Sequence, residues 1–322
     1  MKRGVLSVAL TMAFAAAMPA QKPIPVIFDT DIGDDIDDAL ALALALQSPE
    51  LDIRAVTTVI DDTSTRARLV WKELRLYGRQ DIAVGIGASE PLMGNSRATH
   101  APQFSVLTSG DTLPPHVHER AAQLIVETLM RSPEKLTLIP VGPLTNIALA
   151  LKLEPRIKGK IERIVLMGGA FQMFYPEYNI VRDSTAAQIV FSSGVPVTAV
   201  GLDVTTKCKL QGSDLEKLRA ARNPASQFLV ELIELWQDHH PERYPVLHDP
   251  LAVALRPALV ETQSGAVQVE VSNSGFDALT LFTPADRLGK ESAPTTQVAR
   301  QVDAAKFLEL LVGRLAAAPR SK

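Results

Sequence analysis

The chain has 322 residues, of which 46% are hydrophobic and 21% are charged, so it is long enough to bury a full hydrophobic core. Its formal net charge of −3 excludes the basic footprint of a nucleic-acid-binding protein, and we expect no nucleic-acid partner. The single cysteine, Cys208, excludes an internal disulfide framework and a thiolate-rich metal site. A bound metal would therefore have oxygen or imidazole ligands.

The first twenty residues have the layout of a secretory signal peptide. Two basic residues precede an apolar run from Val5 to Ala17, and small residues continue to Ala20. This run is short for a permanent membrane anchor, and no later stretch of the sequence is longer. We therefore predict a cleaved signal peptide over residues 1–20 and a mature catalytic domain over residues 21–322. The mature protein is expected to be exported, periplasmic or secreted, and not attached to a membrane.

Beyond this leader, strand-like and helix-like stretches alternate along the chain. The predicted strands are Ile24–Phe28, Asp52–Val59, Ile82–Ile86, Leu136–Val141, Ile161–Leu166 and Val197–Gly201. The predicted helices are Ala39–Gln47, Ser64–Tyr77, Glu119–Arg131, Leu144–Leu151 and Ser184–Phe191. Such alternation predicts an α/β fold with a mainly parallel central sheet flanked by helices, in a single domain.

Two regions depart from this alternation. Residues 88–118 have no clear periodicity, and a loop of that length in a compact domain commonly forms a lid or a wall of a site. After residue 213 we expect mostly helix, with a short β segment at Ala266–Ser272 and a closing helix near Val302–Leu315.

The segment FDTDIGDDIDDA, residues 28–39, is the strongest indication of function. It contains six aspartates, namely Asp29, Asp31, Asp34, Asp35, Asp37 and Asp38. They follow the first predicted strand, at the edge where ligands bind in open α/β sheets. So many carboxylates in one turn repel one another, and a hard cation such as Ca²⁺, with its six to eight oxygen ligands, relieves that repulsion.

Three other interpretations of the acidic segment fit its residues less well. An EF-hand beginning at Asp29 would need glycine where Asp34 stands and glutamate where Leu40 stands. A haloacid-dehalogenase-like phosphatase would use the first two aspartates but would leave the later ones without a role. A solvated acidic loop that caps a helix is the third possibility, and such loops seldom follow a buried strand directly.

The same residues resemble a known signature. DTDIGDDIDDALALAL is similar to the N-terminal motif of the inosine–uridine nucleoside hydrolase family, usually written DTDPGxDDAxA, with Ile32 in place of proline and two additional residues. The resemblance implies that Asp31 binds calcium and is the general base on the metal-bound water. It implies that Asp38 is a second calcium ligand, that Asp37 faces the ribose hydroxyls and that Asp29 supports the site. The two additional residues leave open how the later aspartates divide these roles.

Two further segments match the family at strand ends. TTVIDDT, residues 57–63, resembles a segment where an asparagine usually contacts ribose, and Asp62 occupies that place here. LIPVGPLTN, residues 138–146, resembles the segment that offers calcium a backbone carbonyl, which would be that of Val141. Taken alone, Asp61-Asp62-Thr63 is more typical of a turn than of a site. Residues 138–146 also fit a strand that leads into a helix capped near Thr145 or Asn146, and this interpretation is compatible with the carbonyl ligand.

The remaining matches concern the sugar and the leaving base. MGGAFQMFYPEYNI, residues 167–180, resembles the sugar-binding loop, in which Glu177 and Asn179 would bind ribose hydroxyls; an earlier asparagine usual in the family is missing. Asp183 would orient this loop. HDPLAVA, residues 248–254, would supply His248 as the general acid to the departing base and Asp249 as a calcium ligand.

The resemblance implies an enzyme, a calcium-dependent hydrolase that splits ribonucleosides into free base and ribose, with a role in purine or pyrimidine salvage. It also implies a homodimer or homotetramer. Two alternatives stay open, a calcium-dependent nucleoside- or ribose-binding protein without turnover and an N-glycosidase for a non-standard ribosyl substrate. His239 and His240 are expected to line the pocket, and His100, His116 and His118 lie in the long loop that would contact the base.

Overall fold

The computed structural model describes residues 22–93, 101–241, 243–254, 256, 258–271, 278–289 and 296–320. The predicted signal peptide, residues 1–20, and His100 lie outside the described residues. Within the described part of the chain, no helix combines the length and the apolar character needed to cross a membrane.

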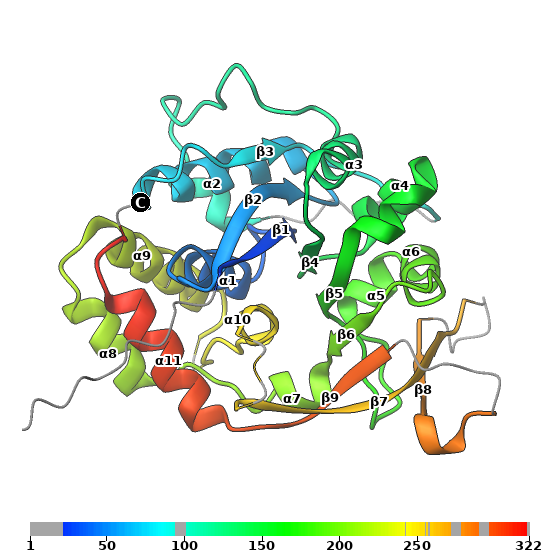
Figure 1. Ribbon diagram of the computed structural model, residues 1–322. Helices are drawn as coiled ribbons and strands as arrows, with labels where there is room; N and C mark the ends of the chain where they lie inside the picture. Colours follow the sequence, from blue (N-terminus) through cyan, green and yellow to red (C-terminus); the bar gives the residue numbers. More distant parts are fainter. Residues whose placement is uncertain are drawn as a thin grey trace, which may run out of the picture.

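A nine-stranded sheet forms the centre of the molecule, with the strand order β3-β2-β1-β4-β5-β6-β9-β7-β8 (Figure 1). The strands are β1 Ile24–Thr30, β2 Leu51–Thr58, β3 Ala83–Gly85, β4 Leu136–Pro140, β5 Ile161–Met167, β6 Val197–Val200, β7 Val260–Val269, β8 Thr280–Pro284 and β9 Thr296–Val302. Strands β1 to β6 and β9 pair in parallel, whereas β7 and β8 pair antiparallel. The predicted α/β class with a mainly parallel sheet is confirmed.

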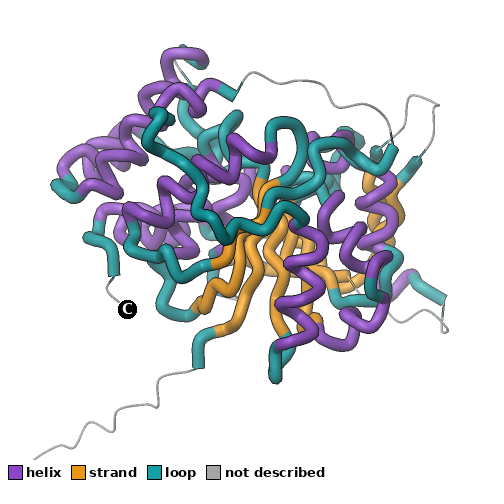
Figure 2. Tube along the Cα trace, turned by 90° about the horizontal axis from the view of Figure 1, so that it is seen from above, coloured by secondary structure: helices purple, strands orange, loops and turns teal. Residues whose placement is uncertain are grey.

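Helices cover both faces of this sheet (Figure 2). They are α1 Asp37–Leu46, α2 Thr63–Leu76, α3 Ala121–Arg131, α4 Thr145–Leu153, α5 Tyr178–Arg182, α6 Ser184–Phe191, α7 Leu202–Thr205, α8 Gly212–Ala220, α9 Pro224–His239, α10 His248–Val253 and α11 Ala304–Ala316. The side chains of a strand alternate between faces, so that in β1 Val26 and Phe28 join the core under α1, α9 and α11, while Ile27 joins the core under α3, α4 and α6. The sheet is therefore buried on both sides, as parallel sheets require.

Helix α1 explains how an alternating Ala/Leu segment forms a helix. Alanine and leucine are strong helix formers, and all ten residues of α1 are buried, so no polar face is needed. The helix begins two residues before the predicted start because Asp37 and Asp38 lie in its first turn, where negative charge is favourable. As a result, two of the aspartates are held on a rigid, buried element.

The expectation of mostly helical structure after residue 213 is wrong for Val260–Val269, Thr280–Pro284 and Thr296–Val302, which are strands. Strand β7 is longer than the expected β segment, and it pairs antiparallel with β8 on one side and with β9 on the other, which extends the sheet. The sequence signal was weak because most residues of β7 and β8 are exposed or half-buried, which dilutes the apolar pattern; β8 is the edge strand, and β7 lies between β8 and β9. The closing helix α11 is confirmed.

Residues 101–118 of the long loop pack against the rest of the molecule as a wall. A short 3₁₀ helix, Pro102–Val106, lies beside the acidic segment, and the Gln103 side chain donates to the carbonyls of Asp34 and Asp35 at 3.3 and 2.5 Å. Further along, Arg68 of α2 donates to the carbonyl of Asp111 at 2.8 Å. These contacts hold the loop against both the acidic segment and α2.

Candidate active site

A cavity of about 1160 Å³ opens at the carboxyl edge of the parallel strands. This volume slightly exceeds the roughly 300–1,000 Å³ typical of small-molecule sites. Its walls come from the segments that follow β1, β4, β5 and β6 and from α9 and α10. Segments that are far apart along the chain therefore meet at one place, which is where ligands bind in open α/β sheets.

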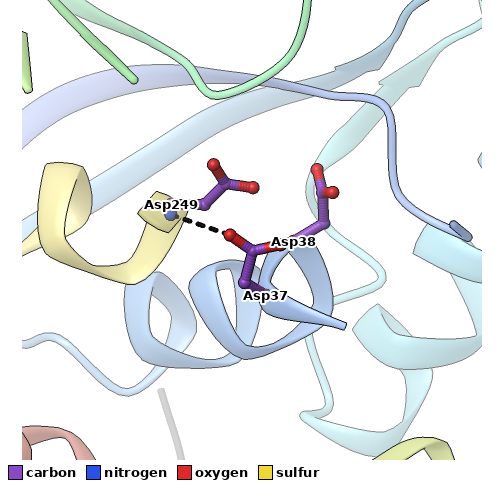
Figure 3. Close-up of side chains that lie close together, drawn as sticks. All are labelled: Asp37, Asp38 and Asp249. Atoms are coloured by element: carbon purple, nitrogen blue, oxygen red, sulfur yellow. Dashed lines mark hydrogen bonds between the residues drawn. The ribbon is translucent and has the colours of Figure 1, made fainter. Parts of the chain in front are cut away.

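Four buried aspartates, which we call the carboxylate floor, line the inner end of the cavity: Asp31, Asp37, Asp38 and Asp249. Figure 3 shows Asp37 and Asp38 in the first turn of α1 beside Asp249 in the first turn of α10. Oxygen atoms of these three carboxylates lie within 4.8 Å of one another. The backbone N–H of Asp249 donates to Asp37 Oδ2 at 3.1 Å, which fixes the two helix starts together.

Burial and mutual repulsion shape the protonation of the floor. Burial, reinforced by repulsion from neighbouring carboxylates, raises the pKa of Asp37, Asp38 and Asp249 well above the usual range. Burial also raises the pKa of Asp31 to about 6. Three clustered oxygen donors that repel one another in a buried place match the hard-ligand preference of Ca²⁺. The donor set fits such a cation.

Asp31 is positioned by its backbone and by close packing. It follows β1 directly, and Arg66 of α2 donates to its carbonyl oxygen. A Cβ atom at Gly142 would lie 2.6 Å from Asp31 Oδ1, so only glycine allows the β4–α4 turn to approach this carboxylate. Asp31 lines the cavity, but it is not one of the three aspartates that form the tight cluster in the described part of the chain. Asp37 is in that cluster, although the resemblance gave it a ribose-binding role.

Asp29 lies one layer behind the floor. Asn146 Nδ2 donates to Asp29 Oδ1 at 2.8 Å and to the carbonyl of Thr58 at 2.9 Å, and Thr57 also donates to Asp29. Burial raises the pKa of Asp29 to about 7. Asn146 therefore ties β1, β2 and α4 together, whereas the N-cap position of α4 is Leu144.

The polar side of the cavity next to the floor is formed around α5. Glu177 caps this helix and accepts hydrogen bonds from the backbone N–H groups of Gly169, Asn179 and Ile180 at 3.1, 2.9 and 3.1 Å. Asn179 Nδ2 donates to the carbonyl of Val141 at 2.7 Å. Glu177, Asn179 and Val141 all line the cavity, so three of the predicted positions converge there.

His248 begins α10 and faces the cavity from the side of α7. Its Nδ1 lies 2.7 Å from the hydroxyl oxygen of Thr205, a residue that sequence analysis did not single out. Burial lowers the pKa of His248 to about 4, so the ring is neutral at neutral pH. A hydroxyl that donates to Nδ1 would leave the proton on Nε2.

The outer part of the cavity is formed by exposed apolar and aromatic side chains, which we call the rim: Met173, Tyr175, Tyr178 and Val181. Between 45% and 55% of the surface of each is exposed. Opposite them, His240 stacks on Trp236 with ring centroids 4.4 Å apart, and both residues line the cavity together with His239. The expectation that His239 and His240 line the pocket is confirmed.

Several predicted residues lie elsewhere. Asp62 is exposed and caps α2 by accepting from Thr65 N at 3.0 Å, and it is not among the described residues that line the cavity. His116 packs edge-on against Trp71, and His118 pairs with β3; neither belongs to the described lining of the cavity. From the described part of the long loop, Pro102 lines the cavity.

Asp183 is buried and accepts hydrogen bonds from Leu92 N, Thr145 Oγ1 and Ala186 N at 2.8, 2.7 and 2.9 Å. It thus joins the long loop, α4 and α6 behind the sugar side of the cavity. Thr205 and Gly142, which the sequence did not single out, carry no local signal, because one is an ordinary helix residue and the other an ordinary turn glycine. Only the approach of distant segments gives them a place in the site.

Comparison with known proteins agrees with this geometry. A family profile described as inosine-uridine preferring nucleoside hydrolase matches residues 26–309. The pyrimidine-specific ribonucleoside hydrolase RihA of Citrobacter koseri is 37% identical over 310 residues, which cover 91% of this chain and 98% of that protein.

Solved structures are similar over the same extent. A plant nucleoside hydrolase superposes with a TM-score of 0.82 at 31% identity, covering 92% of this chain and 99% of its own. A purine-preferring ribonucleoside hydrolase from Gardnerella vaginalis superposes with a TM-score of 0.81 at 31% identity, covering 91% of this chain and 98% of its own. Pyrimidine-specific and purine-preferring enzymes are thus both among the relatives.

Proposed function

The chain belongs to the inosine-uridine preferring nucleoside hydrolase family, and from this premise we propose that it hydrolyses the N-glycosidic bond of ribonucleosides with the help of calcium, releasing base and ribose. It is an enzyme of the N-glycosyl hydrolase class, as its relatives are. The observation that carries the calcium proposal is the cluster of Asp37, Asp38 and Asp249, whose carboxylate oxygens lie within 4.8 Å of one another in a buried place.

The cation would be held by Asp31, Asp38, Asp249 and the Val141 carbonyl, with Asp37 either completing this set or facing the ribose hydroxyls. When bound, calcium supplies a positive charge that lowers the pKa of a water and attracts the sugar diol. The Val141 carbonyl accepts from Asn179 and keeps a second lone pair for a ligand. The proximity of Asp37 to Asp38 and Asp249 supports a direct contribution to the cation site.

Asp31 acts as the general base in this proposal. Its raised pKa makes it a better proton acceptor than an ordinary aspartate, and it stays ionised at neutral pH because that pKa is about 6. It accepts the proton of the attacking water. Glu177 and Asn179 bind the ribose hydroxyls, and these contacts tighten as positive charge builds on the sugar ring, much as in glycoside hydrolysis. Asp62 has no part in this step, because it caps α2 at the surface.

His248 is the general acid that protonates the departing base. Its ring is neutral in the free enzyme, so a proton must reach it with the substrate bound, when negative charge on the leaving base raises its pKa. We expect His248→Ala to lower kcat on ribonucleosides by about 10²–10⁴-fold.

The matched control for this variant is a ribosyl substrate with a nitrophenolate leaving group, which departs without protonation. The His248→Ala enzyme should hydrolyse this substrate at close to the normal rate. An equal loss on both substrates would mean that His248 has another role than proton donation.

The first test of the function is release of free ribose from a panel of purine and pyrimidine ribonucleosides, with calcium and with a chelator. We expect release that depends on calcium, and the panel gives the base preference. Binding of nucleosides without release would contradict the proposal and assign a calcium-dependent binding protein. Release only from a non-nucleoside ribosyl compound would reassign the substrate.

The N-terminal pattern supports two further parts of the proposal, export through a cleaved signal peptide and a periplasmic or secreted location. Calcium dependence agrees with a location outside the cytoplasm. We also propose a homodimer or homotetramer, on the strength of the family. Mass measurement of the purified mature protein tests both the cleavage near Ala20 and the assembly.

A further inference from the structure

A buried ion network connects the acidic segment to the sugar side of the cavity. Its centre is Asp61, whose side chain is 6% exposed. Arg182, the last residue of α5, donates from Nη2 to Asp61 Oδ1 at 2.7 Å and to Oδ2 at 2.9 Å. Arg66 of α2 lies 3.6 Å from Asp61 Oδ2 and donates to Asp34 Oδ2 at 3.0 Å. Two arginines thus share one carboxylate between the two halves of the site.

Arg66 fixes the front of the acidic segment. Its side chain is 1% exposed and donates to the carbonyl oxygens of Asp31, Ile32 and Ile60, the last two at 2.7 and 2.9 Å. The planar guanidinium can serve several acceptors at once, which a lysine cannot do in this geometry. The backbone of Asp31 is therefore held by the same side chain that faces Asp61.

The backbone places Asp61 in this network at a conformational cost. Ile60 and Asp61 have φ values of 61° and 60°, in the left-handed region that a β-branched residue such as isoleucine rarely adopts. The N–H groups of Ile60 and Asp61 donate to the carbonyls of Ala88 and Ser89 at 2.7 and 2.9 Å. The surrounding chain thus enforces a turn that points Asp61 inward and leaves Asp62 at the surface.

Arg182 fixes the other half of the site. It ends α5, the short helix that Glu177 caps and that contains Asn179. Its guanidinium carbon lies 5.7 Å from the ring centre of Tyr178, which lines the cavity. A five-residue helix has little stability of its own, so an ion pair at its last residue has a large influence on where the helix lies.

We propose that Asp61 and Arg182 are positioning residues that hold α5, with Glu177 and Asn179, at the correct distance from the carboxylate floor. This inference rests on the proposed hydrolase function. Neither residue lines the described cavity, so both act through α5 and not by touching the substrate. Arg66 extends the same network to Asp31.

The test is a double-mutant cycle with Asp61→Asn, Arg182→Met and the double variant. We expect KM for the preferred ribonucleoside to rise by roughly 10- to 100-fold in each single variant, because small displacements of binding groups cost that much. Calcium affinity, measured by calorimetry, should stay within about twofold, because the clustered carboxylates are on α1 and α10. The double variant should be no worse than either single one, since both remove the same interaction.

Additional variants separate positioning from general damage. Arg182→Lys keeps the charge, but its shorter side chain ends in an ammonium group where Arg182 places Nη2 between both oxygens of Asp61, so its KM should lie between those of the wild type and Arg182→Met. Arg66→Lys should weaken calcium binding as well, because Arg66 holds the backbone of Asp31. Arg156→Gln, which removes the exposed pair with Glu154, is the matched control and should leave all values unchanged.

An unchanged KM in Arg182→Met, or losses that multiply in the double variant, would overturn the proposal. If the wild-type protein releases no ribose from any nucleoside, this result contradicts the proposed hydrolase function but does not test the positioning role of Asp61 and Arg182. In that case the same double-mutant cycle is measured as nucleoside affinity in the presence of calcium, by calorimetry. Non-additive losses of affinity support the positioning role, and additive losses reject it.

Discussion

Two of the places where the molecule buries carboxyl groups differ in what surrounds them. The carboxylate floor gathers Asp37, Asp38 and Asp249 with hydrogen-bond donors such as the backbone of Asp249 and the hydroxyl of Thr30. Glu73 of α2 is completely buried, and neither of its oxygens has a hydrogen-bond partner in the described part of the chain. Burial raises the pKa of all four groups well above the usual range.

This difference indicates which buried carboxyl groups belong to a functional site. Carboxylates that converge on a cavity form a site whose repulsion a cation relieves, so their cost in the free protein becomes binding energy for the ion. An isolated carboxyl group in an apolar core has no such partner and mainly reduces the stability of the fold. A raised pKa is common to both places, so the geometry of the neighbours separates them.

The largest expected effect tests the floor. We expect Asp249→Asn to abolish calcium binding and to lower kcat/KM by at least about 10²–10³-fold, because it removes a charged ligand from the cluster. Calorimetry with calcium and ribose-release kinetics measure the two losses. Asp286→Asn, an exposed aspartate in the segment after β8, is the control. Normal calcium affinity in Asp249→Asn would show that the cation binds elsewhere.

A second prediction concerns the stability of the floor. Calcium at about 100 times its Kd should raise the free energy of unfolding by about 2.7 kcal/mol, measured by urea denaturation, and Asp249→Asn should lose this gain. In the presence of a chelator the order should reverse, with Asp249→Asn more stable than the wild type, because one of the repelling carboxylates is gone. If calcium did not change the free energy of unfolding of the wild type, this result would contradict the difference drawn between the carboxylate floor and Glu73.

A third prediction concerns Glu73. Its pKa is raised by burial in the folded state, so the folded protein holds a proton that the unfolded chain releases above its ordinary pKa of 4.5. The free energy of unfolding therefore falls as pH rises above that value, by up to about 1.4 kcal/mol per pH unit. Glu73→Gln removes this slope, so the free energy of unfolding of the variant should increase relative to that of the wild type as pH rises.

Urea denaturation in the presence of a chelator, at several pH values between about 5 and 8, measures the Glu73 effect. The comparison is made between Glu73→Gln and the wild type, so that the titration of the floor is common to both proteins. Glu216→Gln, at an exposed position of α8, should show no such difference. Parallel pH profiles for Glu73→Gln and the wild type would mean that Glu73 finds a partner when it ionises.

Much of this protein follows from its sequence alone. Alternating apolar and helical segments predicted the parallel sheet up to β6, since burial on both faces leaves a strong local pattern. The dense run of aspartates after β1 predicted the place of the carboxylate floor, because local charge density and the end of a strand can both be read from neighbouring residues. The segments around Glu177 and His248 were also identified, and their side chains line the same cavity.

Other features depended on the tertiary structure. The sequence could not decide between Asp61 and Asp62, because the direction of each side chain is set by the left-handed turn at Ile60 and Asp61. It did not indicate β8 and β9, because β8 is a largely exposed edge strand and because polar residues interrupt the apolar ones in β9. It gave no sign that Thr205 meets His248 or that Gly142 meets Asp31. Each of these contacts joins segments far apart in the chain, and sheet order and packing, which are not local properties, bring such segments together.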